Sequence, residues 1–181
     1  MKKTPLYQAV DGNRQSGNVA KPILCMDDEA WLGSGYYFWD NSLESAEWWG
    51  KEHYHSNFFI NRSYYDYHSD EYLDLVGNTE HRKYIKNRYD ILVRRRHDTY
   101  TVGELIEILK QKDHDFSFLA VRALPIPSNV DSKQKIFYDQ NNKFYFDANE
   151  KIQMCVIELS FLLNGEYRMI YTETSDPNCA V

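Results

Sequence analysis

The stretch from residue 33 to residue 50 reads GSGYYFWDNSLESAEWWG, and it constrains the fold more than any other part of the chain. Two glycines stand before an aromatic run, and an acidic turn leads into a tryptophan-rich segment. The aromatic run at 35–39 is typical of a β-strand. Asn41 followed by Glu44 matches the capping box that begins a helix. The stretch therefore predicts a strand that runs directly into an amphipathic helix.

The rest of the chain mixes further strand and helix patterns without regular alternation. We expect helices over 80–95 and 101–112, the second with Thr101 as N-cap and Glu104 three residues on. The strand patterns are at 5–10, 71–78, 116–127 and 151–160, with a possible hairpin within 135–147. Because the strands cluster late, the pattern is that of an α+β fold with a mixed or largely antiparallel sheet. With no linker or repeat, we expect one domain over residues 1–181.

Composition favours a folded protein in a reducing compartment. Of the 181 residues, 43% are apolar and 15% aromatic, too many for a disordered chain. No apolar run approaches the length of a membrane span, and no apolar segment follows the N-terminal lysines as in a signal peptide. The three cysteines lack CxxC spacing, so neither a disulfide framework nor a zinc site is expected. We expect a cytoplasmic location.

Charge is unevenly distributed along the chain. The net charge is −6, which argues against nucleic-acid binding by bulk electrostatics. Residues 82–96 nevertheless hold seven Lys or Arg and one acid. This segment is either a solvated helix face or a patch for an acidic or phosphate-bearing partner.

Common catalytic and metal-binding motifs are absent from the sequence. It contains no phosphate-binding glycine loop, no HExxH and no GxSxG. His53 and His55 are two apart, so on a helix they point in different directions, and the acids of 66–74 lack calcium-loop spacing. We therefore expect no metal site.

The opening stretch resembles the central signature of the PARP-like, diphtheria-toxin-like ADP-ribosyltransferases. That signature is Gly-x-Gly-x-Tyr-Phe, about seven residues, then Ser-Ala and an aromatic residue. The residues that match without a gap are Gly33, Gly35, Tyr37, Phe38, Asp40, Ser45, Ala46 and Trp48. The resemblance implies a split mixed or antiparallel sheet with flanking helices, and NAD⁺ as substrate.

In the family, this signature binds the nicotinamide end of NAD⁺. Tyr37 and Trp48 would stack on the two faces of the ring, as aromatic pairs do. Ser45 would hydrogen-bond the carboxamide, and Gly35 would let the backbone approach the ligand. The alternative from the residues alone is an aromatic core strand beside a helix that buries its tryptophans.

The first family signature, Leu-Tyr/Phe-His-Gly, corresponds here to Leu6-Tyr7-Gln8-Ala9. In the family the His binds a ribose and the Gly backbone binds the amide. Gln8 can still donate to and accept from a ribose hydroxyl. Ala9 replaces the glycine and narrows the space near the amide.

The third signature is a late strand that begins with the catalytic glutamate, and Gln153 stands at that position. The family carboxylate stabilises the oxocarbenium-like centre that forms as nicotinamide leaves, whereas an amide supplies only a dipole. Glu150 and Glu158 lie at odd offsets from Gln153, so a regular strand turns them to the other face. Tyr37, Gln8 and Gln153 are thus the expected catalytic set.

Three hypotheses follow from these residues. The first is a diverged ADP-ribosyltransferase, such as a bacterial toxin or effector, that modifies an unknown macromolecular or small-molecule acceptor. The second is a catalytically inactive NAD⁺ or ADP-ribose binding or protein-interaction module of the same fold. The third is an unrelated α+β domain whose basic segment at 82–96 binds a phosphate-bearing partner.

Overall fold

The computed structural model describes residues 1–14, 21–26, 30–125, 135–137, 145–147, 150–163 and 167–173. Its strands are β1 (Lys3–Asp11), β2 (Leu24–Cys25), β3 (Gly35–Asp40), β4 (Phe58–Asp66), β5 (Tyr72–Asp74), β6 (Ala120–Ala123), β7 (Lys135–Phe137), β8 (Tyr145–Asp147), β9 (Gln153–Val156) and β10 (Arg168–Glu173). Its α-helices are α1 (Leu43–Tyr54), α2 (Thr79–Arg96) and α3 (Val102–Lys112). Short 3-10 turns, η1 (Gly12–Arg14) and η3 (Leu159–Phe161), complete the described elements.

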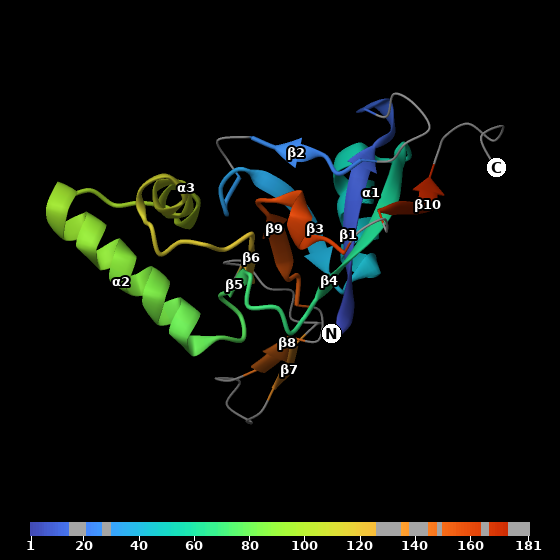
Figure 1. Ribbon diagram of the computed structural model, residues 1–181. Coiled ribbons are helices and arrows are strands. Elements are labelled where there is room, and N and C mark those ends of the chain that lie inside the picture. Colours follow the sequence, from blue (N-terminus) through green and yellow to red (C-terminus); the bar gives the residue numbers. More distant parts are fainter. Residues whose placement is uncertain are drawn as a thin grey trace.

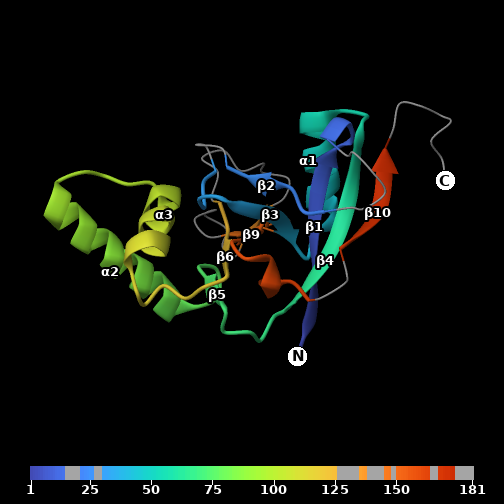
Figure 2. The ribbon, with the colours of Figure 1, turned by 45° about the horizontal axis from the view of Figure 1, so that its top comes forward.

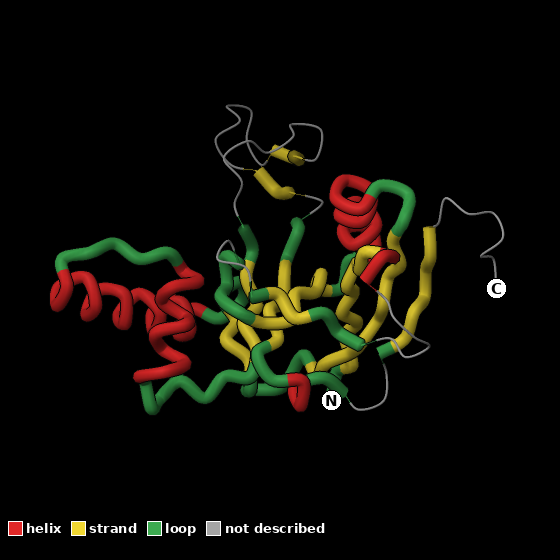
Figure 3. Tube along the Cα trace, turned by 90° about the horizontal axis from the view of Figure 1, so that it is seen from above, coloured by secondary structure: helices red, strands yellow, loops and turns green. Residues whose placement is uncertain are grey.

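One mixed eight-stranded sheet organises the molecule. Its strand order is β10-β4-β1-β3-β9-β6-β5, with β2 also paired to β3. Only the β5–β6 pair is parallel among the described pairings. Helices α2 and α3 lie beside β5 and β6, whereas α1 lies near β1 and β4 (Figure 1). Views from two other directions keep α2 and α3 at the opposite side of the molecule from β10 (Figures 2 and 3).

The sheet is split between β1 and β3. These strands pair where Leu6 and Tyr7 face Asp40 and Trp39. Beyond that point the first half of β3 pairs with β2 instead, through Tyr36 opposite Leu24. Gln8, the next residue of β1, therefore has no register partner on β3.

The two faces of the sheet have different cores. On one face, Trp39 and Ile60 pack with Ala46 of α1, and further along the same face Leu73 and Cys155 pack with Ile106 of α3. The opposite face carries one larger cluster: Leu6, Phe38, Tyr65, Tyr72, Ala120, Met154, Val156, Phe161 and Leu162. The helices therefore cover the face that carries Tyr37 and Trp39, at two separate places.

Several predictions from local pattern are confirmed. The strand at 35–39 runs into α1, and the strand at 5–10 is β1. The capping box of Thr101 and Glu104 begins α3. The 135–147 segment contains the paired strands β7 and β8.

Other predictions were wrong in detail. Ser42, rather than Asn41, caps α1, because the Ser42 side chain accepts the N–H of Ser45 while Asn41 has a left-handed φ of 53°. The strand expected at 71–78 is only Tyr72–Asp74. Strands β4 and β10 were not predicted at all.

None of the helices in the described ranges is long and apolar enough to cross a membrane.

Candidate functional site

The strands that carry Tyr37 and Gln153 are neighbours in the sheet. In the antiparallel β3–β9 pair, Tyr37 lies opposite Cys155 and Trp39 opposite Gln153. Residues opposite each other, and residues two apart on one strand, have side chains on the same face. Tyr37, Trp39 and Gln153 therefore share one surface, between the cluster under α1 and the cluster that includes α3.

Tyr37 holds the turn that precedes its own strand. Its hydroxyl donates to the carbonyl of Gly33 at 2.8 Å and accepts the N–H of Leu32 at 2.9 Å. Burial raises the pKa of this phenol well above its usual value, so the hydroxyl stays protonated at neutral pH. Tyr37, the tyrosine of the resembling stretch, thus already has two backbone partners.

The two glycines of the signature are explained by packing within the chain. Gly33 has a φ of 81°, a left-handed conformation that favours glycine. A Cβ at Gly35 would clash with Cys155 Sγ and would lie 2.8 Å from the carbonyl oxygen of Val156. Both positions thus require glycine without any bound ligand.

Gln153 adjoins Trp31 and Trp39, and the Trp39 ring contacts the other two tryptophans of the chain. Trp31 donates its indole N–H to Gln153 Oε1 at 2.8 Å, and Trp39 faces Gln153 across the strand pair. The Trp39 ring in turn lies 6.2 Å from the Trp48 ring and 5.9 Å from the Trp49 ring. We call Trp31, Trp39, Trp48, Trp49 and Gln153 the tryptophan site.

Ser45 and Trp48 lie on α1 with different exposure. Ser45 is 2% exposed, and its hydroxyl accepts a hydrogen bond from Ser42 at 2.8 Å. Trp48 keeps 40% of its surface exposed, and Lys151 Nζ lies 3.0 Å from its ring centroid. No ring contact joins Tyr37 to Trp48 within the described residues; Trp39 is the neighbour of Trp48 from the sheet.

Gln8 is separated from the other two motif residues. Tyr7 lies opposite Trp39, so strand alternation turns Gln8 to the other face of the sheet. The Gln8 amide exchanges hydrogen bonds with the backbone of Ile23, donates to the carbonyl of Tyr37 and accepts from the Tyr167 hydroxyl. Gln8 therefore bridges the split in the sheet, and its hydrogen-bonding capacity is filled.

Ala9 follows Gln8 on the face of the tryptophan site. It packs against the cluster of Trp39, Ala46 and Ile60 beneath α1. The structure thus places Tyr37, Gln153, Ala9 and Trp48 on one side of the sheet and Gln8 in the split.

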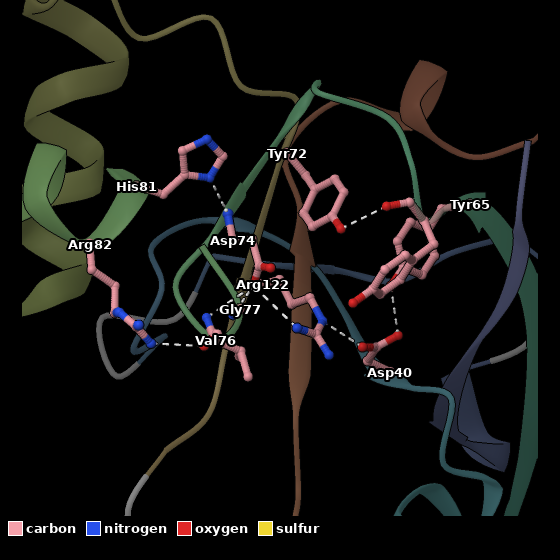
Figure 4. Close-up of polar contacts among 10 residues, drawn as sticks. Asp40, Tyr65, Tyr72, Asp74, Val76, Gly77, His81, Arg82 and Arg122 are labelled. Atoms are coloured by element: carbon pink, nitrogen blue, oxygen red, sulfur yellow. Dashed lines mark hydrogen bonds and ion pairs between the residues drawn. The ribbon is translucent and has the colours of Figure 1, made fainter. Parts of the chain in front are cut away.

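A buried ionic network lies on the opposite face. Arg122 Nε contacts Asp40 at 2.7 Å, and its Nη1 contacts Asp74 at 3.1 Å. Tyr65 donates its hydroxyl to Asp40 at 3.0 Å, and Asp74 N–H donates to Nδ1 of His81 at 2.9 Å (Figure 4). The two carboxylates hold the Arg122 guanidinium firmly, and they raise its pKa further although burial opposes this.

A cavity of about 690 Å³ adjoins this network. Its lining includes Arg122 and Asp40, the first residues of α1 and Glu150. Glu150 is exposed and lies three residues before Gln153. A carboxylate is therefore available near the start of β9, although not at the position expected from the family.

Sequence reasoning missed three residues of these sites. Trp39 could have been found, because strand alternation from Tyr37 places it on the same face. Trp31 and Arg122 had no local signal, since their partners are far away in the sequence.

Among the described residues, no three His, Cys, Asp or Glu side chains gather as a metal site would require. Comparisons of this chain with protein-family models, curated proteins and solved structures give no significant match.

Proposed function

We propose that this chain is a diverged ADP-ribosyltransferase-like domain that binds NAD⁺ or ADP-ribose at the tryptophan site without transferring ADP-ribose. The observation that supports this most is the placement of Gln153. It lies on the strand next to Tyr37, on the same face, with Trp31 and Trp39 as its neighbours. The resemblance assigns Tyr37 and Gln153 to one site, so their shared face supports the proposal.

The tryptophan site has suitable chemistry for a flat ring with an amide. Trp48 is 40% exposed, and a flat ligand ring that displaced the Lys151 ammonium from the face of its indole would stack there favourably. The Gln153 amide can pair with a carboxamide, because it has both a donor and an acceptor. Nicotinamide and adenine both carry the matching groups.

The residue type and the hydrogen bonds at positions 153 and 8 favour binding of NAD⁺ without transfer of ADP-ribose. Position 153 has no carboxylate to stabilise positive charge as the glycosidic bond breaks. Gln153 accepts from Trp31, and Gln8 is fully engaged in the split on the other side. These contacts suit a fixed scaffold better than a catalytic set.

A second candidate is an active transferase that uses Glu150. The specific observation is that Glu150 lines the same cavity as Arg122 and lies close in sequence to Gln153. In this case NAD⁺ would extend from the tryptophan site toward that cavity. The acceptor would be a macromolecule or small molecule that the sequence does not specify.

The test is calorimetric titration with NAD⁺, ADP-ribose and nicotinamide, with tryptophan fluorescence as a second readout. We expect Trp48→Ala to weaken NAD⁺ binding at least tenfold, and Tyr89→Ala on α2 to leave it unchanged as a matched aromatic control. Absence of binding at millimolar NAD⁺ and ADP-ribose would overturn the proposal. Release of nicotinamide that Glu150→Gln abolishes would select the transferase over the binding module.

A further inference from the structure

A second, smaller hollow lies on the β10–β4–β1 part of the sheet. It has a volume of about 270 Å³, and its lining residues are Lys3, Arg62, Tyr64 and Arg168. We call it the basic hollow. Three of its four lining residues are cationic, and none is acidic.

Two of these cations face each other directly. Arg62 on β4 is the register partner of Arg168 on β10. Like charges opposite each other across a strand pair are destabilising. Within the described ranges neither arginine forms an ion pair with a carboxylate. The protein thus keeps a repulsive pair that it does not neutralise from its own described residues.

The Arg62 side chain is held in place but incompletely satisfied. Its guanidinium carbon lies 5.2 Å from the centroid of the Tyr64 ring, and Lys3 Nζ lies 4.1 Å from the same centroid. The Nε of Arg62 is buried and has no hydrogen-bond partner. Phosphate groups bind to arginine N–H donors, and arginines in pairs provide several of them. Arg62 has an N–H without a partner and lies opposite a second arginine, so this pair suits a phosphate ligand.

The basic hollow and the tryptophan site share one face of the sheet. The register partners run in a row from Arg168 through Arg62, Tyr7 and Trp39 to Gln153. Each is directly opposite the next, so all five side chains leave the sheet on the same side. Arg62 and Gln153 are three strand spacings apart, roughly 14 Å.

We propose that the basic hollow is a binding site for a phosphate or pyrophosphate group. The Arg62 and Arg168 guanidinium groups would donate to the phosphate oxygens, and the bound anion would remove the repulsion between them. This site does not depend on nicotinamide binding at the tryptophan site, and its ligand can be a free phosphate or the phosphates of a nucleotide.

The test uses Arg168→Gln, because Arg168 lies exposed on an edge strand and its replacement leaves the core intact. The probe is inorganic pyrophosphate, measured by calorimetry and by thermal unfolding. We expect pyrophosphate to raise the Tm of the wild-type protein, and Arg168→Gln to weaken pyrophosphate binding at least tenfold. The matched control Arg94→Gln, which removes an exposed charge from α2, should bind pyrophosphate within twofold of wild type.

A second variant guards against a folding defect, and further ligands identify the source of the phosphate. Arg62→Lys keeps the charge but loses the planar fork, so it should also weaken binding while circular dichroism stays unchanged. Tighter binding of ADP-ribose than of pyrophosphate, lost in Arg168→Gln, would identify a nucleotide as the ligand, whereas equal binding would indicate a free anion. Undiminished pyrophosphate binding by Arg168→Gln, or no binding by the wild type, would overturn the proposal whatever happens at the tryptophan site.

Discussion

The indole N–H of Trp31 donates to Oε1 of Gln153 at 2.8 Å, across 122 positions in the sequence. Gln153 occupies the place where the resemblance to ADP-ribosyltransferases calls for a glutamate. An indole N–H can donate to a glutamine oxygen or, more strongly, to a glutamate oxygen. The surroundings of this position could therefore accept a carboxylate without a change of fold.

This relationship leads to a gain-of-function prediction. Gln153→Glu would place a negative charge beside Tyr37 and Trp39, where it can stabilise an oxocarbenium-like centre. If NAD⁺ binds at the tryptophan site, we expect the rate of nicotinamide release to rise by about 100-fold, the size of a single electrostatic contribution. Chromatography of nicotinamide formed from NAD⁺ measures this rate.

The control for that experiment is Gln111→Glu, the same substitution at an exposed position on α3. It should leave nicotinamide release at the wild-type level. Nicotinamide release that stays at the wild-type level in Gln153→Glu, despite measurable NAD⁺ binding, would contradict the assigned role of position 153.

Gln8 should matter for stability. Its amide bridges the split sheet through Ile23, the Tyr37 carbonyl and the Tyr167 hydroxyl. Gln8→Leu leaves these buried groups without partners, and we expect the free energy of unfolding to fall by about 2–4 kcal/mol. Urea denaturation checks this value, with Gln111→Leu as the exposed control. A loss no larger than that of the control would show that the bridge contributes little.

Arg122 should be among the least replaceable residues. Its side chain is 10% exposed, and its partners Asp40 and Asp74 are 4% and 12% exposed. Arg122→Met leaves two carboxylates without their cation, so we expect a loss of about 3–5 kcal/mol. Neutralising both acids in the same chain, with Asp40→Asn and Asp74→Asn, should restore part of this stability.

Lys83→Met is the matched control for Arg122→Met. The Lys83–Glu80 pair has side chains 63% and 76% exposed, and such surface pairs contribute little. Chemical denaturation should therefore show Arg122→Met as by far the least stable of three variants. The other two are Lys83→Met and the chain that combines Arg122→Met with Asp40→Asn and Asp74→Asn. Similar stability of Arg122→Met and Lys83→Met would refute the structural role of the network.

His81 should make stability depend on pH. Its Nδ1 accepts the Asp74 N–H, which requires the neutral ring, and burial lowers its pKa below 6.5 although Asp74 partly opposes this. Because the unfolded chain binds the proton more readily, this contribution is present above pH 6.5 and is lost as the pH falls through the folded pKa.

We expect the Tm of the wild type to fall more steeply between pH 7 and pH 5 than that of His81→Asn. The asparagine oxygen can still accept the Asp74 N–H but does not titrate in this range. Differential scanning fluorimetry across the pH series measures both slopes, and equal slopes would count against His81 as the titrating group.

The local sequence was sufficient to predict those helices and strands whose capping residues and propensities lie within a few residues of each other. Thr101 and Glu104 specify the start of α3 because both halves of the capping box are three residues apart. The aromatic run of β3 and the apolar face of α1 predicted a strand followed by a helix. The same local pattern placed the predicted N-cap of α1 one residue too early, at Asn41 instead of Ser42. Both residue types are good N-caps, and only the backbone geometry distinguishes them here.

Strand β4 was not predicted because its core face includes polar residues. Asn61 and Ser63 are almost fully buried, so the strand lacks the alternation of apolar and polar residues that marks a half-buried strand. Asn61 is accommodated because it donates to the Tyr167 hydroxyl, which comes from the other end of the chain. No local pattern contains that partner.

The sequence by itself determined the secondary structure around the signature and the identities of Tyr37, Gln8 and Gln153 as residues of interest. Only the tertiary structure decided their arrangement: Tyr37 and Gln153 share a face, whereas Gln8 fills the split. It also decided that Trp31 and Trp39 meet at Gln153 and that Arg62 faces Arg168. The physical reason is that propensity and capping act between near neighbours, while strand order and register set which distant side chains meet.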